Sequence, residues 1–283
     1  MTGANGLILE GGGMRGVYTA GVLDFFLDKN ISFDACYGVS AGACHCCSYL
    51  SKQKKRAFET NVNYLRDRNY CSFYSLVKTG DLFGVDLIYN QIPNKLHPYD
   101  FEAFDNNPSV FKVVVTNCRT GKAEYITIED LHEDIIAVRA SSSLPLLARM
   151  VEIKGEKYLD GGIADSIPLQ KAIEDGNTKN VIILTQHPGY RKGPNKMLPL
   201  IKRKYKAYPK LIETIEKRHI NYNESLDLIE QEVKAGRAFV IQPKEPVNLG
   251  RIEKDKEKLT ALYEAGYKCG EESYDSLMAF LNS

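Results

Sequence analysis

The sequence predicts an α/β fold, and three observations support this prediction. Two short apolar runs, at residues 7–9 and 35–39, each lead through a glycine-containing turn into an apolar helix. A third run, Val181–Thr185, is β-branched and uninterrupted, as in a strand that is buried on both faces. With 283 residues, 43% hydrophobic and 26% charged, the chain is long enough for one large α/β domain or for a domain with an appendage.

The overall charge and the N-terminus disfavour several classes of protein. The formal net charge is +1, which gives no general reason to expect a polyanionic partner, so we expect no nucleic-acid ligand. Residues 1–5 show no basic segment followed by a long apolar core. No later run reaches the roughly 18 apolar residues that a membrane span needs. We therefore expect a cytoplasmic protein that contacts membranes only from their inner face.

The seven cysteines suggest free thiols in a reducing compartment. Four consecutive residues, Cys44, His45, Cys46 and Cys47, invite interpretation as a metal site. They follow a turn into a helix, however, and neighbouring helical side chains point in different directions. We therefore expect buried thiols, no metal and no cofactor.

The first strand, Leu7–Leu9, runs into a glycine-rich turn that has two interpretations. Gly11, Gly13 and Gly16 fit the dinucleotide fingerprint, and Asp34 lies about 20 residues further on, where a ribose-binding acid is sought. Alternatively, the amides of Gly11, Gly12 and Gly13 point at a developing oxyanion, and Arg15 adds a fixed positive charge. A helix from about residue 17 to residue 29 follows in both cases.

The second strand favours the oxyanion interpretation. Asp34 precedes the apolar run 35–39 rather than ending it, and the run ends in Gly38-Val39-Ser40-Ala41-Gly42. In a G-x-S-x-G elbow the strand turns sharply into a helix and exposes the serine at the tip, and Gly38 and Gly42 provide the space. The elbow predicts Ser40 as a nucleophile.

The stretch after the elbow helix combines basic and aromatic residues. Residues 52–56, Lys-Gln-Lys-Lys-Arg, predict a solvated helix face. Residues 61–104 contain nine aromatic side chains, which either pack in the core or form a cap that lines an acyl-chain pocket over Ser40.

Regular structure returns with strands at Phe111–Asn117 and Glu124–Ile128 and a helix at His132–Arg139. Lys154-Gly155 predicts a hairpin between residues 150–153 and 157–159. Asp160 follows the second strand of this hairpin directly and is itself followed by two glycines, which leave space around it. The sequence therefore offers Asp160 as a candidate catalytic carboxylate.

The C-terminal third is basic at first and then helical. Residues 191–212 hold eight basic and no acidic residues, interleaved with apolar ones, so they form either a solvated helix against the core or a patch for anionic lipid headgroups, centred on residues 191–210. A late strand is expected near 238–242 and one or two amphipathic helices from Arg251 to Leu281. We therefore divide the chain into a catalytic domain, 1–190, and a helical extension, 191–283, packed on it.

Four blocks in this order resemble the patatin-like phospholipase family, specifically its bacterial members. They are residues 11–16 (GGGMRG), 38–42 (GVSAG), 140–145 (ASSSLP) and 160–162 (DGG). The resemblance, which covers about residues 6–185, implies a three-layer α/β/α fold with a mostly parallel central sheet. It also implies a Ser-Asp dyad that hydrolyses acyl esters of lipids. Carried over by motif, it makes Ser40 the nucleophile, Asp160 its partner, and Gly11, Gly12 and Gly13 with Arg15 the oxyanion site.

The residues themselves support ester hydrolysis, independently of the resemblance. An ester carbonyl needs a nucleophile, a proton acceptor and oxyanion stabilisation, but none of the five histidines lies in a recognisable motif, so Asp160 must be partly desolvated to act as a base. We therefore expect an acyl-ester hydrolase that acts on phospholipid or lysophospholipid through an acyl-serine. The alternatives are a non-catalytic lipid- or partner-binding protein on a hydrolase scaffold and an NAD(P)-binding oxidoreductase.

Overall fold

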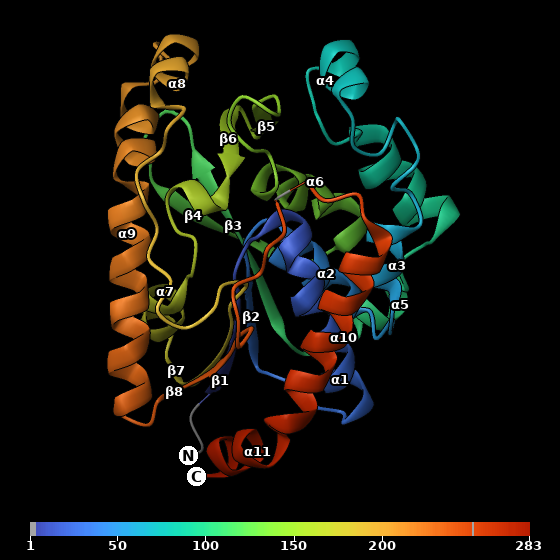
Figure 1. Ribbon diagram of the computed structural model, residues 1–283, viewed down its shortest axis with the longest axis vertical. Coiled ribbons are helices and arrows are strands. Elements are labelled where there is room, and N and C mark those ends of the chain that lie inside the picture. The colour runs from blue at the N-terminus through green and yellow to red at the C-terminus, as the bar shows by residue number, and fades with distance from the viewer. Residues whose placement is uncertain (1–3, 251) are drawn as a thin grey trace.

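The computed structural model describes residues 4–250 and 252–283, which form a central sheet covered by helices on both faces (Figure 1). The first three residues of the N-terminal stretch analysed above lie outside the described residues, as does Arg251, where the C-terminal helical region was expected to begin. Within the described residues the sheet has eight strands: β1 (Ala4–Leu9), β2 (Ala35–Gly38), β3 (Val110–Asn117), β4 (Ala123–Ile128), β5 (Val151–Ile153), β6 (Glu156–Asp160), β7 (Asn177–Ile183) and β8 (Ala238–Ile241).

The strand order is β5-β6-β3-β2-β1-β7-β8, with β4 paired to β3. The four pairs within β3-β2-β1-β7-β8 are parallel, whereas β4, β5 and β6 are added antiparallel. The central strands are buried on both faces, so their side chains alternate between two apolar layers. In β1, Leu7 and Leu9 join one core and Ile8 joins the other. The predicted three-layer arrangement with a mostly parallel sheet is confirmed.

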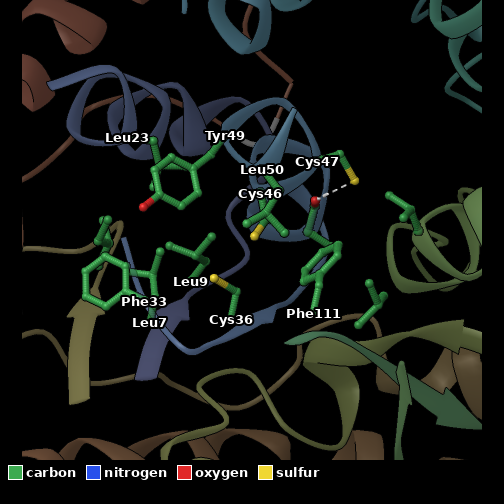
Figure 2. Close-up of a cluster of buried hydrophobic side chains, with 14 of the residues drawn as sticks. Leu7, Leu9, Leu23, Phe33, Cys36, Cys46, Cys47, Tyr49, Leu50 and Phe111 are labelled. Atoms are coloured by element: carbon green, nitrogen blue, oxygen red, sulfur yellow. Dashed lines mark hydrogen bonds between the residues drawn. The ribbon is translucent and has the colours of Figure 1, made fainter. Parts of the chain in front are cut away.

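The larger core lies between the sheet and the layer that contains α1 (Val17–Asp28), α2 (Ala41–Leu50), α6 (Leu131–Ser141) and α10 (Lys256–Glu272). Figure 2 shows Leu7, Leu9 and Cys36 of the sheet beneath Cys46, Tyr49 and Leu50 of α2. Also on this side are α3 (Arg56–Val62), α5 (Phe101–Asp105) and α11 (Tyr274–Asn282). The other face carries α7 (Leu169–Glu174) and α9 (Pro209–Lys234), with α8 (Leu198–Lys204) at the end of α9 (Figure 1).

Two glycines allow α1 and α10 to pack backbone against backbone. A Cβ at Gly21 would lie 2.1 Å from the carbonyl oxygen of Tyr263, and a Cβ at Gly266 would lie 2.0 Å from that of Tyr18. The hydroxyl of Tyr263 also donates to Asp24 Oδ2 at 2.6 Å. Residues from the C-terminal third therefore form part of the main core.

Strand β3 places the ends of β2 and β6 near one another. One edge of β3 pairs with β4 over residues 111–116. The opposite edge pairs first with β2, over residues 110–113, and then with β6, over residues 115–117. Because β6 runs antiparallel, its last residue, Asp160, points back toward the position where β2 ends at Gly38.

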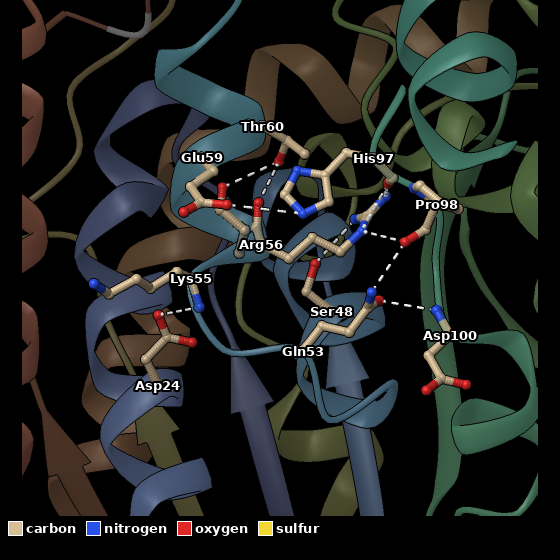
Figure 3. Close-up of polar contacts among 11 residues, drawn as sticks. Asp24, Ser48, Gln53, Lys55, Arg56, Glu59, Thr60, His97, Pro98 and Asp100 are labelled. Atoms are coloured by element: carbon tan, nitrogen blue, oxygen red, sulfur yellow. Dashed lines mark hydrogen bonds and ion pairs between the residues drawn. The ribbon is translucent and has the colours of Figure 1, made fainter. Parts of the chain in front are cut away.

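The predicted solvated face at residues 52–56 is wrong for Arg56. Its side chain is buried at the start of α3, where it donates to Ser48 Oγ at 3.2 Å and to the carbonyl oxygen of His97 at 2.7 Å. Its guanidinium also stacks on Tyr99, 3.3 Å from the ring centroid. Figure 3 shows this side chain between the Ser48 hydroxyl and the 97–98 backbone, which satisfies the buried charge.

Each of the described helices is too short or too polar to cross a membrane.

Candidate active site

Ser40 lies at the tip of a sharp turn between β2 and α2. Its backbone has φ 53° and ψ −122°, a region that non-glycine residues rarely adopt. A Cβ at Gly38 would lie 2.6 Å from Ala43 Cα, and a Cβ at Gly42 would lie 2.5 Å from the Leu9 carbonyl oxygen. Both positions therefore require glycine for space, as the elbow motif predicts.

The glycine-rich turn after β1 approaches Ser40 directly. A Cβ at Gly11 would lie 2.9 Å from Ser40 Cβ, and Gly13 has a φ of 59°. Among the described residues, no hydrogen bond engages the amides of Gly11, Gly12 and Gly13. The turn continues into the short helix η1 (Gly13–Gly16), which carries Arg15. The glycine turn and Arg15 therefore lie beside Ser40.

Asp160 ends β6 and is almost fully buried. Its Oδ1 accepts a hydrogen bond from the Gly162 amide at 2.8 Å, in the short helix η3 (Gly161–Ile163). Its carbonyl oxygen accepts from Thr116 Oγ1 at 2.8 Å. The Gly162 amide thereby orients the carboxylate, and the Thr116 hydroxyl holds the main chain of Asp160.

Two serines at the end of α6 connect the elbow to Asp160. Ser141 Oγ accepts the amide of Ser40 at 2.8 Å, and the carbonyl oxygen of Ser143 accepts the amide of Asp160 at 2.8 Å. The sequence block 140–145 gave a signal for this segment, but the role of Ser141 was not predicted.

Two cavities meet at Ser40, and both include Gly13 and Leu144. The polar one contains Asp160, Arg15 and the turn from Glu10 to Gly13. The other is mostly apolar, and its aromatic and aliphatic lining residues from the 61–104 region are Tyr70, Phe83, Ile88, Tyr89, Ile92 and Tyr99. Several residues of that region therefore form a cap over Ser40, and some, such as Tyr70 and Ile92, are also buried in a core cluster. Ile88 and Ile92 lie on the π-helix η2 (Leu87–Leu96).

Glu10 anchors the glycine turn and was missed by sequence reasoning. Its Oε2 accepts from the amide and the hydroxyl of Thr185, at 2.6 and 2.9 Å. Its Oε1 accepts from the hydroxyl of Tyr222 on α9 at 2.6 Å. Burial and the neighbouring carboxylate raise the pKa of Tyr222, so its phenol remains a donor. The signal that could have identified Glu10 is its position between a buried strand and three glycines.

Asp34 and four of the five histidines line neither of the two cavities at Ser40. Asp34 lies at the start of β2, at the opposite end of the strand from the glycine turn, and accepts the Asn5 amide at 2.7 Å. It therefore cannot serve as the acid of a dinucleotide site at the turn. Of the five histidines, His45 alone lines a cavity with Ser40 among those described, and burial lowers its pKa to about 4.

The cysteines are all free, and five are buried. Cys46 and Cys47 lie in the core, whereas Cys44 lines the apolar cavity. Within the part of the chain that the structure describes, no group of three potential ligands could hold a metal ion.

Fold and site together define a class: α/β proteins with a serine at a strand-to-helix elbow, beside a glycine turn and a buried carboxylate. Residues 7–173 match the model of the Patatin-like phospholipase family, which covers more than half of the chain. The chain therefore belongs to the patatin-like phospholipase family, and this membership places it among the lipid ester hydrolases. Residues 208–282 match a second model, described as a domain of unknown function (DUF6363).

Relatives include the uncharacterized protein YjjU of Escherichia coli K12, 26% identical over 272 residues, which are 93% of this chain and 75% of YjjU. The probable lipid hydrolase 463L of invertebrate iridescent virus 6 is 25% identical over 191 residues, or 62% of this chain and 65% of the viral protein. The crystal structure of VipD from Legionella pneumophila is similar in fold, with a TM-score of 0.51 and 14% identity over 96% of this chain and 67% of VipD.

Proposed function

We propose that the protein hydrolyses fatty acyl esters of phospholipids or lysophospholipids, with Ser40 as nucleophile and Asp160 as its general base. The observation that carries the proposal is that Ser40, Asp160 and the Gly11–Gly13 turn line one cavity, while Ser40 also lines an apolar one. An ester of a long-chain acid needs both environments at its carbonyl. The amides of Gly11, Gly12 and Gly13, with Arg15, stabilise the oxyanion.

The reaction proceeds in two steps. Asp160 accepts the proton of Ser40 Oγ as the oxygen attacks the ester carbonyl, and then gives the proton to the departing alcohol, which leaves an acyl-serine. Water then attacks the acyl-serine while Asp160 accepts its proton, and Asp160 returns this proton to Ser40 Oγ as the acyl–oxygen bond breaks, which releases the fatty acid and free Ser40. Because a carboxylate is a weak base for a hydroxyl, the oxyanion donors carry a large share of the rate, each worth about 10²–10³-fold.

The apolar cavity is the place for the acyl chain. Ile88, Ile92 and Tyr89 supply its apolar surface, and burial raises the pKa of Tyr89, which keeps its ring neutral there. The alcohol part of the substrate then occupies the polar cavity on the other side of Ser40.

Peripheral contact with an anionic membrane through residues 191–210 is the second part of the proposal. Lys196, Arg203, Lys204 and Lys206 are exposed, and none of them forms an ion pair with a described residue. Met197 and Leu200 are about half exposed beside them, at 51% and 47%. Figure 1 shows α8 and α4 (Phe73–Thr79) at the same end of the long axis, and α4 exposes Phe73 and Val77. Together with seven free thiols, this supports action from the cytoplasm at the inner face of the membrane.

Release of fatty acid from a lysophospholipid tests the proposal. We expect Ser40→Ala to lower kcat by at least about 10³-fold without loss of fold, because the nucleophile is removed. Ser225→Ala is the matched control, since Ser225 hydrogen-bonds to its own helix on the surface of α9 and lines neither cavity. Turnover by Ser40→Ala at the wild-type rate would refute the assignment.

The non-catalytic alternative makes a different prediction. A folded wild-type protein that binds vesicles but releases no fatty acid would favour a lipid-binding role.

Addition of a short alcohol separates hydrolysis from acyl transfer, because a competing acceptor diverts the acyl-serine to a new ester.

A further inference from the structure

The polar cavity beside Ser40 is not built by the family-matched region alone. Its lining includes Lys192, in the loop between β7 and α8, and Arg218 and Tyr222 on α9. These residues lie beyond the match to the phospholipase family, which ends at residue 173. The sequence placed Lys192 in a membrane-facing patch and gave Arg218 no role, whereas the structure brings both to the candidate active site.

Arg218 reaches the backbone that orients Asp160. Its Nε donates to the carbonyl oxygen of Gly162, the residue whose amide donates to Asp160 Oδ1. A Cβ at Gly162 would lie 3.1 Å from Arg218 Nη2 and 3.0 Å from Asp160 Oδ1. The guanidinium is therefore next to the proposed base, in a half-buried position.

Lys192 is held at the cavity by α9. Its amide donates to Asn223 Oδ1 at 2.8 Å, and Asn223 Nδ2 donates back to its carbonyl oxygen at 3.1 Å. Its Nζ lies 4.1 Å from the centroid of the Tyr222 ring. The Tyr222 hydroxyl donates to Glu10, so the ring that the Lys192 ammonium contacts is held in place.

The charges around this cavity favour an anion. Three cations line it, Arg15, Lys192 and Arg218, against two carboxylates, Glu10 and Asp160. Glu10 is already engaged by Thr185 and Tyr222. Charges that are partly withdrawn from water interact more strongly than exposed ones, and a guanidinium presents paired donors that match phosphate oxygens.

We propose that Lys192 and Arg218, together with Arg15, form a subsite for a phosphate group of the substrate. The subsite rests on the proposed function, because the ester must reach Ser40 while the phosphate occupies the polar cavity. In an acylglycerophosphate the phosphate belongs to the alcohol part, opposite the acyl chain in the apolar cavity. The C-terminal part of the chain thus selects acyl lipids with a phosphate close to the scissile ester over neutral acylglycerols.

The test compares a lysophosphatidic acid with a monoacylglycerol of the same medium-length acyl chain, both below their micelle concentrations. We expect Lys192→Gln to lower the ratio of their kcat/KM values about tenfold, mainly through KM of the phosphate-bearing lipid. Lys192→Arg is expected to keep the ratio, because it keeps the charge. Lys234→Gln removes an exposed charge at the end of α9, outside the cavity, and is expected to leave the ratio at the wild-type value.

An unchanged ratio in Lys192→Gln would overturn the proposal, as would an equal fall in Lys234→Gln. If the wild type hydrolyses neither lipid, the proposed function fails, and calorimetric titration with inorganic phosphate then decides on the subsite. Phosphate binding that weakens in Lys192→Gln and not in Lys234→Gln supports the anion site, and no binding to the wild type refutes it. Lysine-dependent phosphate binding with an unchanged lipid ratio would identify free phosphate as the ligand and overturn the assignment to a lipid headgroup.

Discussion

Ser40 occupies a backbone conformation that costs a non-glycine residue about 1–3 kcal/mol. Its own amide donates to Ser141, its carbonyl oxygen accepts the Cys44 amide at 3.1 Å, and the Gly42 amide donates to the Val39 carbonyl oxygen at 2.8 Å. These contacts from two helices hold the strained turn. The strain therefore lies at the residue that we propose to react, and its surroundings maintain it.

His45 makes stability depend on pH in a defined direction. Its pKa is about 4 in the folded protein because of burial, and about 6.5 in the unfolded chain. Between these values the unfolded chain binds a proton that the folded protein does not, so the free energy of unfolding falls as the pH falls. The effect of this group is absent above about pH 6.5 and reaches about 3 kcal/mol below pH 4.

Urea denaturation of the wild type and His45→Gln at several pH values between 7 and 4 measures this effect. We expect the stability difference between the two proteins to shift by up to about 3 kcal/mol in favour of the variant as the pH falls. Asp24, whose pKa burial raises to about 6, acts in the opposite direction but is common to both proteins. Parallel pH profiles would contradict the assignment to His45.

On the scale of elements, α8 has one buried and one exposed side. Ile201 and Tyr205 pack into a cluster with Leu159 and Ile163 next to Asp160, while the basic side chains face outward. The hydroxyl of Tyr205 also accepts the Leu146 amide at 3.0 Å. A membrane contact at α8 would therefore be connected to the candidate active site through residues 144–147, which Tyr205 contacts.

Binding to vesicles that contain anionic lipid tests this contact. Replacement of Arg203, Lys204 and Lys206 by glutamine is expected to weaken binding by about 3 kcal/mol, or roughly a hundredfold, at about 1 kcal/mol per charge. The control variant replaces Lys234, Lys256 and Lys268 by glutamine. These lysines are exposed on other elements, and their replacement removes the same net charge. Equal weakening in both variants would show only a general charge effect, contrary to the proposal.

For the molecule as a whole, the C-terminal part is integrated with the rest. Strand β8 extends the sheet beside β7, α10 packs on α1, and α9 contributes to the polar cavity. We propose that residues 191–283 act as an extension that completes the site. Removal of that extension would expose β7 and the α1 surface around Gly21.

The sequence predicted the parts of this architecture whose signals are local. Strands β1, β2 and β3, the elbow at Ser40 and the hairpin that ends at Asp160 each follow from a few consecutive residues. The structure then brings Ser40, Asp160, Arg15 and the glycine turn into one cavity.

The contacts that the sequence did not predict are made across the fold. Arg56 looked like part of a solvated charge run because its partners, His97 and Tyr99, lie more than 40 residues away. Lys192 and Arg218 reach the site because α9 packs against η3, and neither residue lies in a recognisable motif. Such approaches depend on the packing of whole layers, which periodicity alone does not specify.

The most direct test of the central claim is labelling with a fluorophosphonate probe, followed by peptide mapping. The account predicts one major adduct, on Ser40, in the wild type, strong loss of labelling in Asp160→Asn, and no adduct in Ser40→Ala. A folded wild-type protein that carries no adduct on Ser40, in buffer and in the presence of lipid vesicles, would contradict it.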